Sequence, residues 1–92
     1  MPKPTAPVIN LNGSSAQTLV EEYKAAYTAI RVAYEAVQQV TVHGRDFQTA
    51  PEGTYEKARA EQTARLTKLQ EVEDDMAELA RLVQQQVDAR KR

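Results

Sequence analysis

The chain has 92 residues, 41% of them hydrophobic and 27% charged, and carries a formal net charge of −1 at pH 7. This length allows one domain at most, and the near-neutral charge argues against general binding of nucleic acid duplexes or anionic membranes, which need a basic surface. The absence of cysteine excludes disulfides and thiolate metal sites and fits a reducing compartment, so we expect a cytoplasmic protein that carries no cofactor.

Residues 1–13 are expected to form an extended arm. Pro2, Pro4 and Pro7 interrupt this stretch, which shows no helical period. Lys3 lies near the start, but no apolar core of a signal peptide follows it, and no apolar run approaches the roughly 20 residues that span a bilayer. We therefore expect neither secretion nor membrane insertion.

A first helix is predicted over residues 14–42. Ser14, three positions before Gln17, matches a capping box, in which both side chains bond free backbone N–H groups at a helix start. Apolar residues then recur every three or four positions, which is typical of a helix with one buried face. They are Ala16, Val20, Tyr23, Tyr27, Ile30, Tyr34 and Val37, with Leu19, Ala26, Ala33 and Val40 on one flank.

A loop over residues 43–53 separates this helix from a second one, predicted over residues 54–90. Gly44, Pro51 and Gly53 break the helical pattern in the loop. Thr54 is placed to cap the second helix, although Thr49 with the Glu three residues later offers a competing start. The apolar stripe of this helix is Tyr55, Ala58, Leu66, Leu69, Val72, Met76, Leu79, Leu82, Val83 and Val87.

These elements predict an all-α fold, an antiparallel two-helix hairpin. Each helix would be about 40–55 Å long at about 1.5 Å per residue. Two such rods enclose too little interior for a stable core, and neither disulfides nor metals supplement it. We therefore expect the hairpins to assemble into an oligomeric helical bundle.

The start of the first helix is a candidate anion site. Asn12, Gly13, Ser14 and Ser15 combine two hydroxyls with the unpaired N–H groups and positive dipole end of a helix, which attract phosphate or carboxylate. The structural alternative is that Ser14 caps its own helix.

The loop carries a second candidate site, made of five consecutive residues. Arg45 is suited to clamping a phosphate with two hydrogen bonds, and Phe47 to stacking on a base. In the structural alternative, Arg45 pairs locally and Phe47 plugs the end of the bundle. The full set is His43, Gly44, Arg45, Asp46 and Phe47. A single histidine without a second ligand argues against a metal site.

A third candidate is a polar gap in the stripe of the second helix, where Arg59, Gln62 and Arg65 replace apolar residues. The hairpin predicts that these three lie close to Tyr34, with Tyr27 as a further candidate neighbour. Polar groups turned inward cost free energy unless they are paired, so a partner subunit, Glu35, water or a bound anion would have to satisfy them. Alternatively, the helices splay and solvent satisfies these side chains.

Two further groups have simpler interpretations. The tyrosines at helical spacing are typical of a core with wet hydroxyls. The acidic residues of the second helix lack the spacing of a calcium loop, which predicts a solvated face; they are Glu71, Glu73, Asp74, Asp75 and Glu78. No catalytic motif or phosphate-binding loop occurs, so we expect a non-enzymatic protein.

The residues Leu11-Asn12-Gly13-Ser14-Ser15-Ala16 and His43-Gly44-Arg45-Asp46-Phe47 resemble those of a group of short phage and prophage helical-hairpin proteins. The resemblance covers nearly the whole chain except the proline-rich arm and assigns no site residues. It implies a viral accessory protein, similar in style to the oligomeric sponges that sequester nucleotide signals of bacterial immunity, acting in the host cytoplasm.

Two functions follow as hypotheses. In the first, a homo-oligomer sequesters a small anionic nucleotide at subunit junctions, with arginines and helix N-termini holding phosphates. In the second, the protein is a structural adaptor or an inhibitor of a host protein that acts through a helical face. Neither requires turnover.

Overall fold

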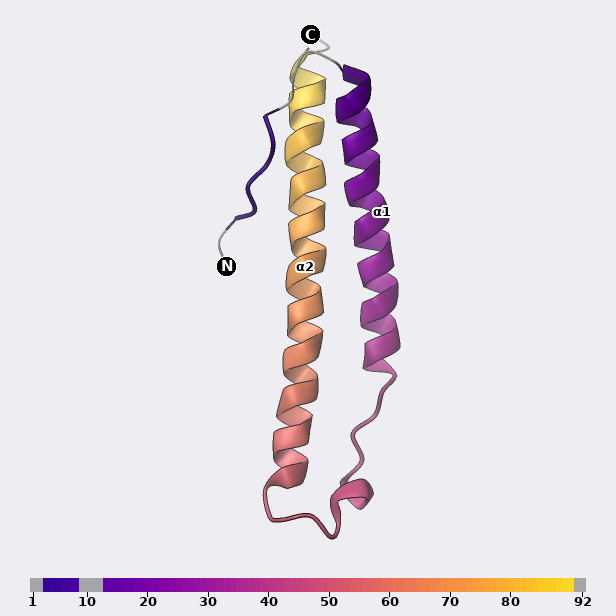
Figure 1. Cartoon of the computed structure of the whole chain (residues 1–92), viewed down its shortest axis with the longest axis vertical. Coiled ribbons are helices and arrows are strands. Elements are labelled where there is room, and N and C mark those ends of the chain that lie inside the picture. The colour runs from indigo at the N-terminus through magenta and orange to yellow at the C-terminus, as the bar shows by residue number, and fades with distance from the viewer. Residues whose placement is uncertain (1–2, 9–12, 91–92) are drawn as a thin grey trace.

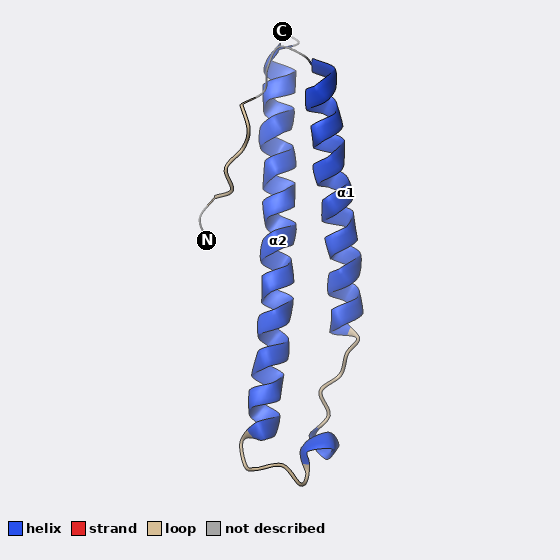
Figure 2. Ribbon diagram, in the orientation of Figure 1, coloured by secondary structure: helices blue, strands red, loops and turns tan. Residues whose placement is uncertain are grey.

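The computed structural model describes residues 3–8 and 13–90. For residues 13–15 it describes only the backbone. Two long helices, α1 (Gly13–Gln38) and α2 (Thr54–Arg90), lie side by side and antiparallel, and a short 3-10 helix, η1 (Gly44–Phe47), lies between them in the chain (Figures 1 and 2). The described residues contain no strand. The predicted all-helical hairpin is therefore confirmed.

The N-terminal arm adds a third layer. Residues 3–8 run beside α2, on the side away from α1 (Figure 1). The side-chain amide of Gln86 donates a hydrogen bond of 2.9 Å to the carbonyl oxygen of Pro7, which fixes the arm to the C-terminal half of α2. Proline suits this position because it lacks a backbone donor and cannot continue a helix.

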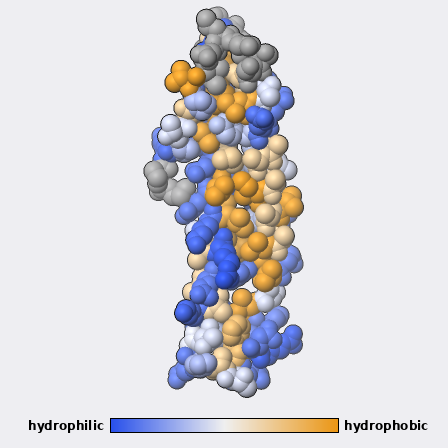
Figure 3. All heavy atoms as spheres, viewed as in Figure 1, coloured by the Kyte–Doolittle hydropathy of each residue, from blue (hydrophilic) through white to orange (hydrophobic). Residues whose placement is uncertain are grey.

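The buried apolar residues all lie in the half of the hairpin remote from the loop. α1 contributes its first two turns and α2 its last three to this core. Its members are Ala16, Val20, Leu79, Ala80, Val83 and Val87. Elsewhere the stripes are half-buried, and Figure 3 shows apolar side chains gathered in a strip along the junction of the two helices.

α1 ends at Gln38, four residues before the predicted end at Val42. The amide of Gln39 is shared between the carbonyls of Glu35 and Ala36, at 3.2 Å each, which tightens the last turn. Residues 40–42 are Val-Thr-Val, and such β-branched side chains lose rotamer freedom in a helix. Sequence periodicity alone did not reveal this stop.

The starts of the helices also differ from the capping predictions. α1 begins at Gly13, so Ser14 and Ser15 lie inside its first turn, and Ser14 does not precede the helix as a cap. α2 begins at Thr54, and its first backbone bond runs from Lys57 N–H to the carbonyl of Gly53 at 3.0 Å. Gly53 has a φ of 87°, a conformation that glycine adopts without strain. The competing start at Thr49 is not used.

Among the described residues, no helix is both long enough and apolar enough to cross a bilayer. Large apolar side chains nevertheless reach the surface of both helices: Val32 is 61% exposed and Val72 45%.

Candidate functional site

The loop end of the hairpin holds an aromatic and cationic cluster, the loop cluster, formed by Gly44, Phe47, Tyr55 and Arg59. The rings of Phe47 and Tyr55 are tilted by 45° with centroids 6.0 Å apart, and the Arg59 guanidinium lies 5.6 Å from the Tyr55 centroid. A Cβ at Gly44 would lie 3.7 Å from the Tyr55 ring, so the η1 backbone packs directly against that ring. Tyr55 thus joins η1 to the first turns of α2.

Three polar members of the predicted loop site surround this cluster without joining it. His43, Arg45 and Asp46 are exposed, and within the described part of the chain none of their side chains makes a hydrogen bond or ion pair. The backbone amide of Asp46 donates a hydrogen bond of 3.1 Å to the carbonyl of His43. Arg45 therefore carries an uncompensated positive charge at the tip of the molecule.

Gln62 caps the end of α1. Its side-chain nitrogen donates to the carbonyls of Val37, at 2.9 Å, and Val40, at 3.3 Å, while its side-chain oxygen accepts a 3.3 Å bond from Arg65. Carbonyls at a helix end lack intrahelical partners, so this amide satisfies groups that the early end of α1 exposes.

The polar gap in the stripe therefore has a structural explanation. Arg59 and Arg65 are exposed, and Gln62 is half-buried and bonded to backbone. None of the three makes a hydrogen bond to Tyr34 in the described residues; Gln62 bonds instead to Val37, three residues beyond that tyrosine in the last turn of α1, and to Val40, just after the helix ends. A hollow of about 230 Å³ remains beside Arg59 and Gln62, lined also by residues 38 and 40–42.

The other predicted anion site lies at the opposite end of the rod. Asn12 falls outside the described residues, and Gly13, Ser14 and Ser15 form the first turn of α1, beside the C-terminal end of α2 (Figure 1). The molecule measures 65 Å along its longest axis. The two predicted sites thus cannot contact the same small ligand within one copy.

The structure also reveals a buried charge that the sequence analysis assigned to the solvated face. Glu73 is only 6% exposed, and the Arg31 guanidinium reaches across from α1 to within 3.6 Å of its Oε1. The other oxygen, Oε2, has no hydrogen-bond partner among the residues that the structure describes. The prediction for Glu73 was wrong because the strict 3–4 spacing of the inward stripe, 66, 69, 73, 76, 80, 83, 87, includes this position.

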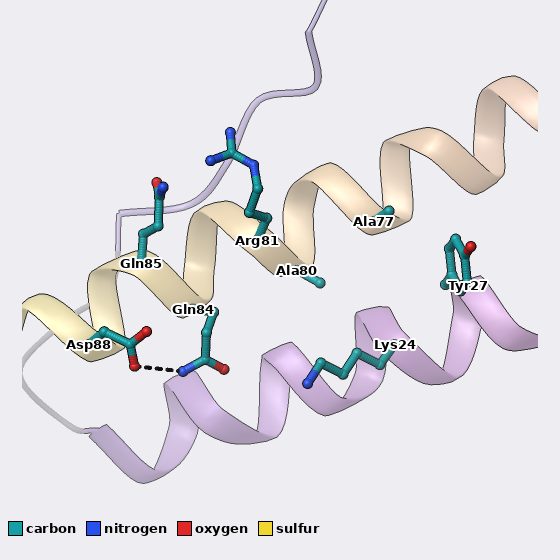
Figure 4. Close-up of a pocket in the computed structure, with 8 residues that line it drawn as sticks. All are labelled: Lys24, Tyr27, Ala77, Ala80, Arg81, Gln84, Gln85 and Asp88. Atoms are coloured by element: carbon teal, nitrogen blue, oxygen red, sulfur yellow. Dashed lines mark hydrogen bonds between the residues drawn. The ribbon is translucent and has the colours of Figure 1, made fainter.

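A groove lies on the same side of the hairpin as this ion pair. Figure 4 shows Tyr27 pointing from α1 toward α2, whereas the Lys24 side chain runs along α1; the small side chains of Ala77 and Ala80 on α2 leave about 470 Å³ unfilled. Gln84, Gln85, Arg81 and Asp88 complete its lining.

The polar side chains around this groove pair within α2. Gln84 donates a 2.9 Å bond to Asp88. Beside the groove, the hydrogen bond from Arg81 lowers the pKa of the Glu78 carboxyl below its ordinary value; desolvation opposes this shift, and charge attraction from Arg81 and Lys3 adds to it. These local pairs leave the groove floor apolar.

Comparison of the chain with protein-family models, curated proteins and solved structures finds no match. Within residues 3–8 and 13–90, no three His, Cys, Asp or Glu side chains are grouped so that they could hold a metal ion. The described surfaces therefore offer two kinds of chemistry: apolar contact along the helices, and an exposed arginine beside aromatic rings at the loop.

Proposed function

We propose that the protein is a non-catalytic binding protein that works as a homo-oligomeric helical bundle, with its activity carried by helical surfaces that dock on protein. The observation that carries this proposal is the amount of surface that a single hairpin leaves in water. The accessible surface is 6881 Å², whereas a compact monomer of 10.3 kDa would expose about 5,400 Å².

The shape supports the same conclusion. The radius of gyration is 19.2 Å, compared with about 12 Å for a compact domain of this length. The accessible surface that the hairpin exposes beyond the value for a compact monomer is comparable to the total of about 1,600 Å² that a standard protein interface buries. Six small or medium apolar side chains form the buried core of the described residues, too few to offset the entropy of ordering two long helices.

Sedimentation equilibrium across a range of concentrations tests this proposal. We expect a species of at least twice the chain mass at micromolar concentration, and a thermal midpoint that rises with concentration because association stabilises the folded form. A folded, concentration-independent monomer would overturn it.

Nucleotide sequestration is a second candidate, and the loop cluster favours it. Arg45 is exposed and unpaired, and the Phe47 and Tyr55 rings with the Arg59 guanidinium offer stacking surfaces next to it. Arginine binds phosphate with two hydrogen bonds, and aromatic rings stack on bases. In this proposal the protein is a viral sponge that removes a nucleotide immune signal in the host cytoplasm without converting it.

A ligand panel separates the two candidates. Cyclic and linear nucleotides are added to the purified protein, and the thermal midpoint is recorded together with recovery of intact ligand after heating. Sequestration predicts a rise of several degrees with unmodified ligand released, and loss of that rise in Arg45→Ala. Arg90→Ala, at the other end of the rod, is the matched control. If no nucleotide raises the midpoint, the adaptor function is favoured.

A further inference from the structure

We propose that two copies pair antiparallel through one defined face of the hairpin, with Val72 of both copies at the twofold axis. This inference rests on the proposed self-association and adds the face, the register and the residues that select it. The pairing is of α2 on α2 and α1 on α1, which makes a four-helix bundle in which neighbouring helices all run antiparallel.

The exposure of apolar side chains identifies the face of the hairpin that pairs with the second copy. On the groove side, Arg31 and Glu73 close the junction between the helices. Val72 lies about 100° around α2 from Glu73, on the other side of the junction, and is the large apolar side chain of α2 that stays 45% exposed.

α1 continues the same apolar face. Leu19, Ala26, Ile30, Ala33 and Val37 follow one flank of α1 at helical spacing, and four of them are half-buried while Ala33 is exposed. The apolar strip in Figure 3 runs along the helix junction in the same way. A second hairpin laid on this strip would complete the burial that one hairpin begins.

The length of α2 indicates the register in which the two copies of this helix pair. α2 spans Thr54–Arg90, so Val72 is its central residue, and a twofold axis there overlaps the entire helix with its copy. The broad face of the molecule measures 65 by 23 Å, enough for the roughly 800 Å² per partner that a stable dimer buries.

Charge complementarity supports the same axis. Lys68 and Asp75 flank Val72 at positions four before and three after, so all three lie on one face of α2. Neither charge has an ion pair within the described residues. Antiparallel pairing about Val72 sets Lys68 within one residue, about 1.5 Å along the axis, of the level of Asp75 in the second copy. The symmetry repeats this contact, as it does for the flanking charges of coiled coils.

The pairing also brings the two ends of the rod together. The ion pair of Arg31 with Glu73 shows which residues of the two antiparallel helices lie at the same level along the rod. In this register the first turn of α1 lies at the level of the end of α2. The twofold axis at Val72 then places this end of the rod, with the first turn of α1 and the end of α2, at the level of η1 and the start of α2 in the second copy. The positive helix end and Arg45, remote in one copy, become neighbours across the seam.

Charge reversal tests the register. Lys68→Glu and Asp75→Lys should each weaken dimerisation by about tenfold or more, because two attractive contacts become two repulsive ones. The double variant Lys68→Glu/Asp75→Lys should recover wild-type dimerisation, since the pattern is self-complementary in both polarities. Asp74→Lys, an exposed change elsewhere on α2, is the control and should leave it unchanged.

Cysteine crosslinking tests the axis independently. The chain has no cysteine, so Val72→Cys introduces a single thiol, which should form an intermolecular disulfide under mild oxidation because two copies of the residue meet. Val32→Cys is the control: it is more exposed, at 61%, but lies about 200° around α1 from Ile30, away from the proposed face.

The outcomes distinguish this inference from the proposed function. A wild-type dimer that ignores the charge reversals and is not crosslinked through Val72→Cys would overturn the face and register and leave self-association standing. A wild-type monomer at every concentration would overturn both. Circular dichroism of each variant must show unchanged helicity for the comparison to hold.

Discussion

The two halves of the hairpin are stabilised in different ways. In the half that carries the termini, α1, α2 and the arm bury valines, alanines and a leucine against one another. In the loop half no described residue is buried, and the structure depends on a tyrosine packed against η1 and a glutamine that caps α1. The first half is specified by apolar area and the second by a few directional polar contacts.

This difference shows what a third layer contributes. The arm lies along α2 on the side away from α1 and is bonded to Gln86, and in this half of α2 Leu79 is only 8% exposed. Toward the loop the described residues of the arm do not extend along α2, and Leu66 and Leu69 stay half-buried. In the proposed dimer the second copy would take the place of that missing layer.

The largest expected effect is from leucine truncation in the two halves. Leu79→Ala should lower the free energy of unfolding by about 3 kcal/mol, because it removes buried methyl groups and leaves a cavity. Leu66→Ala, the same change at a half-buried site, should cost about half as much. Urea titration at equal protein concentration measures both, and equal losses would contradict the contrast between the halves.

Replacing Glu73 should act in the opposite direction. Glu73→Leu removes a buried carboxylate with one unpartnered oxygen and restores an apolar residue to the inward stripe, so the free energy of unfolding should rise by about 1–3 kcal/mol. Arg31 is exposed and loses little when its partner is removed. Asp74→Leu is the neighbouring control. Loss of stability in Glu73→Leu would mean that Oε2 has a partner outside one copy.

Glu73 and Val72 also show what sequence periodicity could and could not provide. The all-helical hairpin and the stripe of α1 followed from regular 3–4 spacing of apolar residues. In α2, the apolar Val72 was placed in the stripe because it is hydrophobic, whereas the spacing selects Glu73. At this turn the 3–4 spacing of the stripe, and not the hydrophobicity of a single residue, indicates which side chain is buried.

Contacts between side chains that are distant in the sequence could not be predicted from the pattern of residues. Gln62 stood out as a polar residue within an apolar stripe, but its partners are the carbonyl of Val37 in the last turn of α1 and that of Val40 just beyond the helix, and both are available to it because α1 ends at Gln38. Among the candidate site residues, the structure joins Gly44, Phe47 and Arg59 through Tyr55, which the sequence analysis had assigned to the core alone. Whether any of them binds a ligand stays a prediction.

Gln62→Ala tests how the loop half is held. The loss of two hydrogen bonds to the end of α1 should lower the free energy of unfolding by about 1 kcal/mol and let the last turn of α1 fray. Hydrogen exchange should accelerate at the amides of Gln39 and Val40 and stay unchanged in the terminal half. Gln70→Ala, an exposed glutamine of α2, is the control; uniform acceleration along both helices would show that the halves unfold as one unit.

The smallest effect is expected from acidification, and it should be confined to the half that carries the arm. The pKa of Glu78 lies below its ordinary value because Arg81 bonds the charged carboxylate and Lys3 of the arm attracts it. A group with a lowered folded-state pKa stabilises the protein above its unfolded-state pKa, and that contribution is lost as the pH falls through the folded-state value. The thermal midpoint of the wild type should therefore decline more steeply in this acidic range than that of Glu78→Gln. Glu56→Gln, in the loop half, should keep the wild-type slope; if it flattens the profile as Glu78→Gln does, the acid sensitivity belongs to both halves and the contrast between them does not extend to charge.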